Sequence, residues 1–327
     1  MPKLSVLIPI YGVEKYIEKC VRSLFEQTLD DIEFVFVDDC TPDKSIDILQ
    51  RLVIEYATQL EKTNKQIRIE KMPKNGGLAA VRKYGLQFCT GDYIVHCDSD
   101  DWLDVHMYER LYACANNNKY DLVFCDYIIS TGDIKSEKTF EKAIVDTSQS
   151  SLIKRLLTSS DLNPVWSVFA KRSLYNNIVP AKGDMSEDNV LVVQLVCNAK
   201  NIFYLNDPLY YYRLTPGSIV RKNDEVSIMK KFNQVRENRK IINDFLDKLG
   251  IRNDFKRELI AYLYDVKMRI IPLLDQKKYY LIWKNTYSDI NNKILYNPCI
   301  SLKNKVLYIL LHIALFRKIY CKKIKAI

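Results

Sequence analysis

The stretch GDYIVHCDSDDWLD, Gly91–Asp104, decides the fold that this sequence predicts. It contains a short apolar run rich in β-forming residues, Tyr93–Cys97, which indicates a buried strand. Three carboxylates follow within four positions, Asp98, Asp100 and Asp101. If strand geometry continues past the apolar run, Asp98 and Asp100 point to the same side, because side chains alternate along a strand.

An acidic cluster of this kind is costly unless a cation or a hydrogen-bond network offsets the repulsion between the carboxylates. Two carboxylates spaced two residues apart can share a hard cation such as Mg²⁺ or Mn²⁺, which in turn can hold a diphosphate. The alternative is an acidic turn that caps the helix following Trp102, with Asp101 or Asp104 at the N-cap. An isolated DxD pattern favours the turn, so the choice depends on the rest of the chain.

The composition indicates a globular chain with a substantial core. It has 327 residues, which predicts one large domain with additions or two domains, and 48% of them are hydrophobic. Nine cysteines are scattered without a CxxC pair, which argues against a disulfide framework or a zinc site and for a reducing compartment. The first residues, MPKLSVLIPIYG, are typical of a first strand and not of a secretion signal.

Strands and helices alternate through the first third of the chain. The predicted strands are Lys3–Tyr11, Ile32–Val37, Ile67–Met72 and Tyr93–Cys97, and the predicted helices are Glu14–Gln27, Asp43–Leu60 and Gly76–Cys89. The first two strands are continuous apolar runs, as expected of strands buried on both faces. The alternation predicts an α/β fold with an open, mainly parallel sheet covered by helices on both sides.

Polar residues follow the predicted strands at the positions where a ligand is expected. In open parallel sheets, ligands bind beyond the carboxyl ends of the strands. Tyr11 follows the first strand, Asp38 and Asp39 follow the second, and Asp98 and Asp100 follow the fourth. The first turn lacks a GxGxxG pattern, which argues against a dinucleotide-binding Rossmann site, and the absence of a Walker A pattern excludes a P-loop NTPase.

Two segments carry a family resemblance: SVLIPIYGVEKYIEKCVRSLFEQTLDDIEFVFVDDCTPDKS, residues 5–45, and NGGLAAVRKYGLQFCTGDYIVHCDSDDW, residues 75–102. The chain resembles glycosyltransferase family 2, whose members have the GT-A nucleotide-sugar-binding fold. The resemblance is dense over the first third of the chain and looser up to residue 215. Several ordered and correctly spaced motifs are more specific than any one of them alone.

The resemblance implies a nucleotide site at the ends of the first strands. Pro9 and Tyr11 match the family's cradle for the base, and Glu14 matches a contact to the base or ribose. Asp39 matches the carboxylate that accepts a hydrogen bond from uracil. The alternatives are that Tyr11 packs at the strand end and that Asp38 is structural.

The resemblance also implies a diphosphate and metal site. A loop and helix beside the base and diphosphate are matched by Asn75, Gly77 and Arg82. Alternatively, Arg82 is a surface helix residue that pairs with an acid. The family's DxD motif is matched by Asp98 and Asp100, with Asp100 the direct ligand of Mn²⁺ or Mg²⁺ and Asp98 nearer the ribose and a metal-bound water. Ser99, between them, belongs to the same substrate-binding segment.

The middle of the chain has coarser patterns. A helix is expected at Val105–Asn118, a strand at Leu122–Ile129, and an edge hairpin or mobile loop at Ser130–Asp146. A further strand is expected at Asn163–Ala170, in which Trp166 either lines an acceptor pocket or packs in the core.

A second chemical site is expected at Met185–Leu195, MSEDNVLVVQL. Ser186 is a good N-cap, and the helix dipole favours Glu187 and Asp188 in the first turn whatever their function. The family carries such an acidic pair at this distance after its DxD, and its second acid takes the proton of the acceptor hydroxyl. The resemblance therefore implies that Asp188 is the general base, with Glu187 beside it in the substrate site.

Pro208–Arg221, PLYYYRLTPGSIVR, resembles the family segment that closes over the donor. Arg213, Ser218 and Arg221 are candidates to contact the diphosphate, because arginine suits phosphate oxygens. The alternative is a tyrosine-rich strand packed on the sheet.

Three regions are predicted. Residues 1–220 form the GT-A domain, with a nucleotide-binding half at 1–104 and an acceptor-binding half at 105–220. Residues 221–301 form a helical appendage, with long helices at Asp224–Leu249 and Asn253–Leu274. Residues 302–327 form a basic, apolar tail helix.

The tail carries much of the charge. The net charge of the chain is +9, and seven Lys or Arg and no acid lie between residues 302 and 327. The apolar stretch Val306–Phe316 is far shorter than the roughly 20 residues that span a bilayer. It suits a helix in the interface of an anionic membrane, and the alternative is a terminal helix packed against Asp224–Leu274. Because the basic residues gather in an aliphatic tail, no nucleic-acid partner is expected.

Together these features predict a metal-dependent inverting glycosyltransferase of the hexosyl- or N-acetylhexosaminyl class. The donor is a nucleoside-diphosphate sugar, with a UDP-sugar favoured, and the acceptor is a hydroxyl of a saccharide or lipid-linked saccharide. By family analogy the enzyme acts in surface polysaccharide biosynthesis, in the cytoplasm and peripheral to the membrane. One alternative is a sugar-phosphate nucleotidyltransferase, which is disfavoured because its Gly-rich, Arg-containing loop is missing. The other is a membrane-associated, non-catalytic nucleotide-sugar binder.

Overall fold

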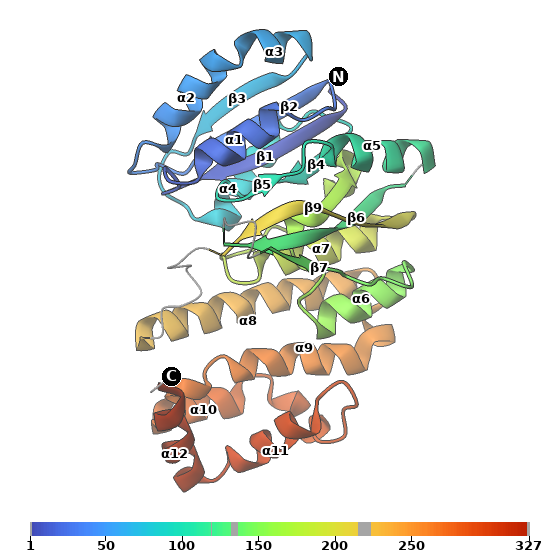
Figure 1. Ribbon diagram of the computed structural model, residues 1–327. Helices are drawn as coiled ribbons and strands as arrows, with labels where there is room; N and C mark the ends of the chain where they lie inside the picture. The colour runs from blue at the N-terminus through green and yellow to red at the C-terminus, as the bar shows by residue number, and fades with distance from the viewer. Residues whose placement is uncertain (1, 119, 132–136, 215–223, 326–327) are drawn as a thin grey trace. The chain divides into compact units, whose positions relative to one another are not determined.

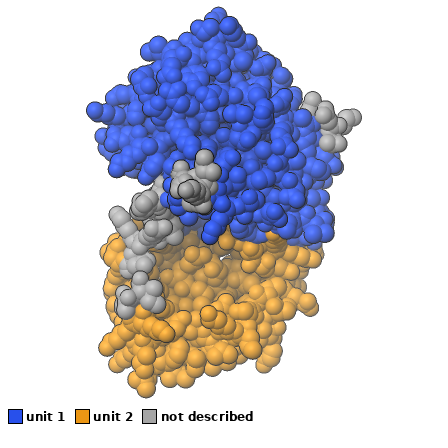
Figure 2. Space-filling model, in the orientation of Figure 1, with its two compact units in different colours: residues 1–153, 161–216 blue, residues 154–160, 217–327 orange. Residues whose placement is uncertain are grey.

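The computed structural model describes residues 2–118, 120–131, 137–214 and 224–325 (Figure 1). The chain divides into two compact units, which are coloured separately in Figure 2. The first unit comprises residues 1–153 and 161–216, and the second comprises residues 154–160 and 217–327. Both contain fully buried large side chains, such as Phe34 in the first and Trp283 in the second. The division into three regions, at residues 1–220, 221–301 and 302–327, stays a prediction.

The first unit begins with four parallel strands (Figure 1). β1 (Leu4–Ile10), β2 (Ile32–Asp38), β3 (Gln66–Lys71) and β4 (Tyr93–His96) lie in the order β3-β2-β1-β4. Every residue of β1, β2 and β4 is buried, whereas β3 is more exposed at the edge. The apolar runs of the sequence thus form a parallel sheet, as predicted.

Helices cover both faces of these strands. Side chains alternate along β1, so Val6 packs in one core with α1 (Ile17–Phe25), α2 (Ser45–Glu55) and α5 (Met107–Asn118). Leu7 packs in a second core with α4 (Leu78–Gly85). The single helix predicted at Asp43–Leu60 is two helices, α2 and the short α3 (Ala57–Lys62), which meet at Tyr56. Because the four strands are parallel, their carboxyl ends and the loops that follow them share one edge of the sheet.

The remaining strands extend the sheet in mixed directions. β8 (Val168–Lys171) is antiparallel to β4 and to β6 (Leu122–Ser130), β6 is parallel to β9 (Ile202–Arg213), and β9 is antiparallel to β5 (Trp102–Leu103). β7 (Lys138–Phe140) pairs with β6, which confirms an edge hairpin in Ser130–Asp146, although residues 132–136 lie outside the described part. The helices of this region are α6 (Gln149–Thr158) and α7 (Glu187–Asn198).

Two local expectations differ from the structure. Asn163–Ala170 is not a continuous strand, because a 3₁₀ turn at Val165–Ser167 precedes β8 and the Ser167 hydroxyl donates to the Pro164 carbonyl at 2.7 Å. Ser186 occupies the N-cap position of α7, as expected, but its φ is 63° and its side chain makes no capping hydrogen bond to the described residues. A left-handed backbone at Ser186 turns its hydroxyl away from the usual capping position.

The second unit is helical in its described part. Its helices are α8 (Glu225–Lys248), α9 (Lys256–Met268), α10 (Lys277–Asn285), α11 (Leu302–Leu310) and α12 (Ala314–Lys325). The Asp224 carboxylate caps α8 by accepting the Ser227 backbone N–H at 2.9 Å. No helix among the described residues is both long enough and apolar enough to cross a membrane.

The tail consists of two short helices, so the expectation of a single tail helix is wrong. The chain turns between α11 and α12, where Leu311 is fully buried and the His312 ring lies 5.1 Å from the Trp283 ring. In α12, the buried Cys321 thiol donates to the Ile271 carbonyl at 3.1 Å. Tertiary packing therefore ends the first helix and holds the tail against preceding segments of the same unit, as in the alternative of a packed terminal segment.

Candidate active site

The Asp39 carboxylate organises the loop before α4. Asp39 follows β2 and is buried, and it accepts the backbone N–H groups of Gly76 at 2.7 Å and Gly77 at 2.9 Å. It also accepts a hydrogen bond from the Asn75 side-chain amide at 3.0 Å. A carboxylate has about four lone-pair sites, so these three bonds leave about one for a ligand. The structure brings Asp39, Asn75 and Gly77 together through bonds with one another.

Gly77 occupies a position that only glycine fits. Its φ is +81°, and a Cβ built there would lie 2.8 Å from both carboxylate oxygens of Asp184. Asp184 itself accepts the Ala79 backbone N–H at 3.1 Å, in the first turn of α4. Sequence analysis missed Asp184, because a single acid 105 residues from its partner gives no local signal.

Asp98 and Asp100 follow β4 at the carboxyl edge of the sheet. The Asp98 side chain is 26% exposed and accepts a hydrogen bond from Arg82 Nη2 at 2.8 Å. Burial raises the pKa of Asp98, and the guanidinium of Arg82 opposes that rise. Burial and then repulsion by Asp98 raise the pKa of Asp100 to about 6. A cation beside Asp100 would relieve this unfavourable environment for a negative charge.

The third carboxylate of the cluster fastens the loop to β9. Asp101 is buried and accepts the Tyr210 hydroxyl at 2.7 Å and the Arg213 backbone N–H at 2.7 Å. The Tyr210 oxygen in turn accepts the Asp98 backbone N–H at 3.1 Å. Asp101 is therefore a structural support of the DxD loop. Tyr210 was not predicted, because a tyrosine-rich strand does not reveal which ring reaches the loop.

Glu187 and Asp188 begin α7, and Arg82 hydrogen-bonds to both of their carboxylates. The same guanidinium binds Asp98, so one side chain joins the DxD motif to the acidic pair. The Arg82 side chain is 3% exposed, so the alternative of a surface helix residue is wrong, although Arg82 does pair with acids. Burial raises the pKa of Glu187 well above its ordinary value, although Arg82 opposes the rise. The Asp188 side chain is 33% exposed and is the more accessible of the pair.

The residues predicted at the base have unequal exposure. Tyr11 is 53% exposed, so it is not packed at the strand end, whereas Pro9 lies within the buried strand β1. The Ser99 hydroxyl donates to the Pro9 carbonyl at 2.6 Å and thereby fastens the DxD loop to β1. The Glu14 carboxylate accepts the Lys44 backbone N–H at 3.2 Å. Of these residues, Tyr11 and Glu14 are exposed and thus available to a ligand.

Trp166 belongs to the core and not to a pocket wall. It is 4% exposed, and its ring stacks on Tyr210 with centroids 4.1 Å apart. Arg213 ends β9 and contacts the DxD loop: its Nε donates to the Asp100 carbonyl at 2.8 Å, and its guanidinium carbon lies 4.5 Å from the centroid of the Trp102 ring. Ser218 and Arg221 lie outside the described residues.

The donor set of the DxD motif fits a hard divalent cation only in part. Within the described ranges, no three His, Cys, Asp or Glu side chains are grouped to hold a metal ion. Mg²⁺ is usually bound through one or two carboxylates together with substrate phosphates and waters. The carboxylates of Asp98 and Asp100 fit that pattern when a diphosphate supplies further oxygens, and Arg82 already engages Asp98.

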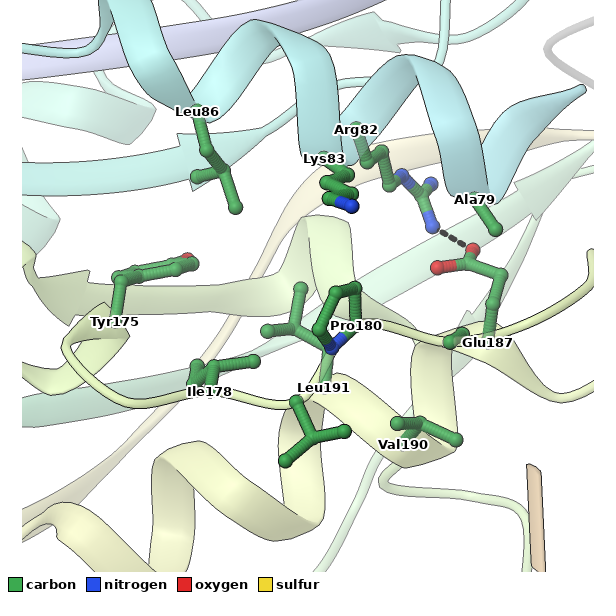
Figure 3. A pocket seen from close by; sticks show the side chains of 12 residues that line it. Ala79, Arg82, Lys83, Leu86, Tyr175, Ile178, Pro180, Glu187, Val190 and Leu191 are labelled. Carbon is green, nitrogen blue, oxygen red and sulfur yellow. Dashed lines mark hydrogen bonds and ion pairs between the residues drawn. The ribbon is translucent and has the colours of Figure 1, made fainter. Parts of the chain in front are cut away.

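A cavity of about 420 Å³ lies beside the acidic pair (Figure 3). Its walls come from α4, from residues 175–181 and from the first turns of α7, and most of the lining side chains are apolar. Figure 3 shows the ion pair of Arg82 and Glu187 at its edge. Asp98, Asp100 and Asp188 are not among the lining residues. No motif in the sequence predicted this cavity.

Comparisons with known proteins agree with the geometry. A family model described as glycosyl transferase family 2 matches residues 5–177. The putative glycosyltransferase EpsH of Bacillus subtilis (strain 168) is 30% identical over 298 residues, which cover 84% of this chain and 83% of that protein. The poly(ribitol-phosphate) beta-glucosyltransferase of Bacillus spizizenii is 30% identical over 216 residues, which cover 64% of this chain and 32% of that protein.

Solved structures resemble the chain over most of its length. The S. aureus TarS fragment 1–349 matches with a TM-score of 0.64 and 19% identity, over 98% of this chain and 88% of that chain. The same fragment in complex with UDP-GlcNAc matches with a TM-score of 0.60. At this identity the likeness shows the fold alone, and it confirms the predicted GT-A α/β fold with a C-terminal helical region.

Proposed function

Because the chain belongs to glycosyltransferase family 2 and is a glycosyltransferase, we propose that it transfers a sugar from a UDP-sugar to a hydroxyl of a saccharide or lipid-linked saccharide acceptor. One observation carries the proposal: Arg82 binds Asp98 of the DxD motif and both acids at the start of α7. Donor-side and acceptor-side carboxylates thus belong to one connected site, although they lie 90 positions apart in the sequence.

The nucleotide would lie at the carboxyl edge of β1 and β2. Tyr11 offers an exposed ring, and Asp39 retains about one acceptor position for the uracil N–H. A likeness to TarS, which has been solved with UDP-GlcNAc, supports a UDP-sugar as donor. The sugar itself would extend from the diphosphate towards Asp188.

Asp100, with Asp98 beside it, would hold Mn²⁺ or Mg²⁺. When bound, the ion offsets negative charge on the departing diphosphate. The raised pKa of Asp100 supports this assignment, because an environment poor for a lone carboxylate becomes favourable beside a cation. Arg213 holds the Asp100 backbone in place through its Nε.

Asp188 would act as the general base. Its carboxylate takes the proton of the acceptor hydroxyl as that oxygen forms a bond to the anomeric carbon. The bond from this carbon to the diphosphate oxygen breaks on the opposite face, and its electron pair leaves with UDP. The configuration at the anomeric carbon therefore inverts, and no covalent intermediate with the protein is needed.

We also propose that the second unit binds an anionic membrane from its cytoplasmic side. Apolar side chains on α11 and α12 are exposed: Leu302 (77%), Val306 (46%), Ile309 (50%), Leu315 (69%) and Ile319 (62%). Exposed Lys303, Lys318, Lys322 and Lys323 accompany them. Apolar rows flanked by lysines suit the interface of a negatively charged bilayer.

The nine free cysteines support a reducing compartment. The likeness to a poly(ribitol-phosphate) beta-glucosyltransferase supports a role in surface polymer synthesis.

The test is a panel of nucleotide sugars incubated with the purified full chain and Mn²⁺. We expect release of free UDP from one UDP-sugar, at a higher rate when an acceptor saccharide is added. Release of pyrophosphate instead would identify a nucleotidyltransferase, and binding without turnover would identify a non-catalytic binder. The anomeric configuration of the product, read by NMR, decides between inversion and retention.

A further inference from the structure

We propose that Arg82 is a positioning residue, which holds Asp188 in the orientation that accepts the proton and does not itself bind the donor diphosphate. The inference rests on the proposed function and deepens it. The family resemblance placed Arg82 beside the base and diphosphate, whereas the structure assigns its guanidinium to carboxylates of the protein.

The hydrogen bonds of Arg82 occupy both ends of its guanidinium. Nη2 donates to Asp98 at 2.8 Å, and Nη1 donates to both Glu187 and Asp188. Nε is buried and has no hydrogen-bond partner in the part of the chain that the structure describes. With 3% of the side chain exposed, Arg82 has no open edge for the forked binding of a diphosphate. A role in arranging the protein's own acids fits these contacts better than a contact to the donor.

The acidic pair depends on this cation. Glu187 is 5% exposed, and the cavity beside it is lined mostly by apolar side chains (Figure 3). Without the guanidinium, Glu187 and the neighbouring Asp188 lose the cation to which both carboxylates are hydrogen-bonded. Asp188, the more exposed of the two, is the carboxylate that can swing away. A displacement of about 1 Å in a catalytic group can cost about 100-fold in rate.

The arrangement also connects the two halves of the reaction. Asp98 lies on the donor side and Asp188 on the acceptor side, and one guanidinium binds both. The orientation of the base is therefore set by the same side chain that fixes the first carboxylate of the DxD motif. Lysine has a single nitrogen and cannot reproduce the planar fork that reaches three carboxylates.

The experiment compares Arg82→Lys and Arg82→Ala with the wild type in two assays. UDP affinity is measured by calorimetry with Mn²⁺, and turnover is measured as UDP release from the UDP-sugar that the wild type uses. We expect kcat to fall at least 100-fold in both variants, while the Kd of UDP, which Arg82 affects only through Asp98, changes less than tenfold. Lys83→Ala is the matched control, because Lys83 is the next residue of α4, is exposed and lines the same cavity.

Guanidinium chloride at low millimolar concentration supplies a second readout. The cavity beside Arg82 offers an entry path, so the free cation should restore part of the turnover of Arg82→Ala and none of that of Asp188→Asn. If Arg82→Ala does not fold, Arg82→Lys alone decides the question through its kcat and Kd. A Kd for UDP that rises 30-fold or more with unchanged kcat at saturating donor would overturn the inference. A wild type that neither binds UDP nor turns over any UDP-sugar would overturn the proposed function, and the inference with it.

Discussion

The backbone N–H of Gly76 lies 2.7 Å from Oδ1 of Asp39, so the residue expected to contact uracil also holds the loop that precedes α4. Asp39→Asn replaces one carboxylate oxygen by an NH2 group, so either Gly76 N–H, which binds Oδ1, or Gly77 N–H, which binds Oδ2, loses its acceptor. We expect a loss of about 0.5–1.5 kcal/mol in the free energy of unfolding, measured in urea, because one part-buried hydrogen bond to a carboxylate is lost. UDP affinity should fall in the same variant. If the affinity for UDP falls and the free energy of unfolding does not, Asp39 contacts the nucleotide directly and its hydrogen bonds to the loop contribute little to stability.

Asp100 should destabilise the metal-free protein at neutral pH. Its pKa is raised to about 6 in the folded state, above the ordinary value of about 3.9, so the unfolded chain binds fewer protons between these values. The contribution of Asp100 to the stability of the wild type therefore falls as the pH rises from 4 through 6. Asp100→Asn removes the penalty and should gain about 1–2 kcal/mol at pH 7.5 in EDTA, and nothing at pH 4.

The control for this variant is Asp92→Asn, because Asp92 is exposed at the other end of β4. Asp100→Asn should also abolish the Mn²⁺-dependent part of UDP binding, which calorimetry measures with and without the metal. An equal response to Mn²⁺ in wild type and variant would remove Asp100 from the metal site.

Asp188→Asn should stop turnover and leave the donor site intact. A neutral amide cannot take the acceptor proton, and loss of a general base costs about 100- to 10,000-fold in rate. The Kd of UDP should stay within threefold of the wild type. Asp47→Asn is a matched control, since Asp47 is an exposed acid in the first turn of α2. Turnover that survives in Asp188→Asn would assign the base to another group.

Gly77→Ala and Gly12→Ala form a pair that compares a crowded glycine with an uncrowded one. Both glycines have a positive φ, +81° and +69°, and Gly77 combines it with a ψ of 169°, a backbone region that essentially only glycine populates, at a strain of about 1–3 kcal/mol for other residues. Among the described residues, a Cβ at Gly12 meets nothing within 4 Å, whereas a Cβ at Gly77 meets the Asp184 carboxylate at 2.8 Å. Thermal unfolding should therefore show a larger loss for Gly77→Ala. An equal loss of thermal stability in the two variants would mean that the Asp184 carboxylate can move away from the added methyl group at little cost.

The strands were predictable because their signal is local. β1 and β2 are continuous apolar runs that end in polar residues. A strand that is buried on both faces needs apolar residues at successive positions, so such a run is enough to predict it. The DxD motif and the acidic pair were found by residue type and spacing. The strands and these acids could thus be predicted from short segments, each considered by itself.

The connections between those segments were not predictable. Arg82 and Glu187 lie 105 positions apart, and nothing near Arg82 reveals that three carboxylates converge on it. The break in the tail has the same origin: it contains neither glycine nor proline, and it depends on the packing of Leu311 and of His312 against Trp283. Contacts between residues far apart in the sequence determine both the ion pairs of Arg82 and the break in the tail, and no pattern of neighbouring residues predicts such contacts.

Membrane binding by the tail is best tested by surface substitutions. Deleting residues 302–327 would remove the buried Leu311 and Cys321 and disturb the helices beneath them, so a loss of binding would be ambiguous. Leu315→Glu and Ile319→Glu change only exposed positions on α12, which are 69% and 62% exposed. Each removes an apolar side chain whose burial in the interface contributes about 1.5–3 kcal/mol and adds a charge that anionic lipid repels.

We therefore expect the double variant to bind phosphatidylglycerol vesicles at least tenfold more weakly than the wild type in a co-sedimentation assay. Ile54→Glu is the control, because Ile54 is 78% exposed on α2 in the first unit. Added salt should weaken wild-type binding, since the lysines of the tail act by charge. Binding that is equal in the wild type and the double variant, or equal on neutral phosphatidylcholine, would show that the exposed face of α12 does not meet a membrane.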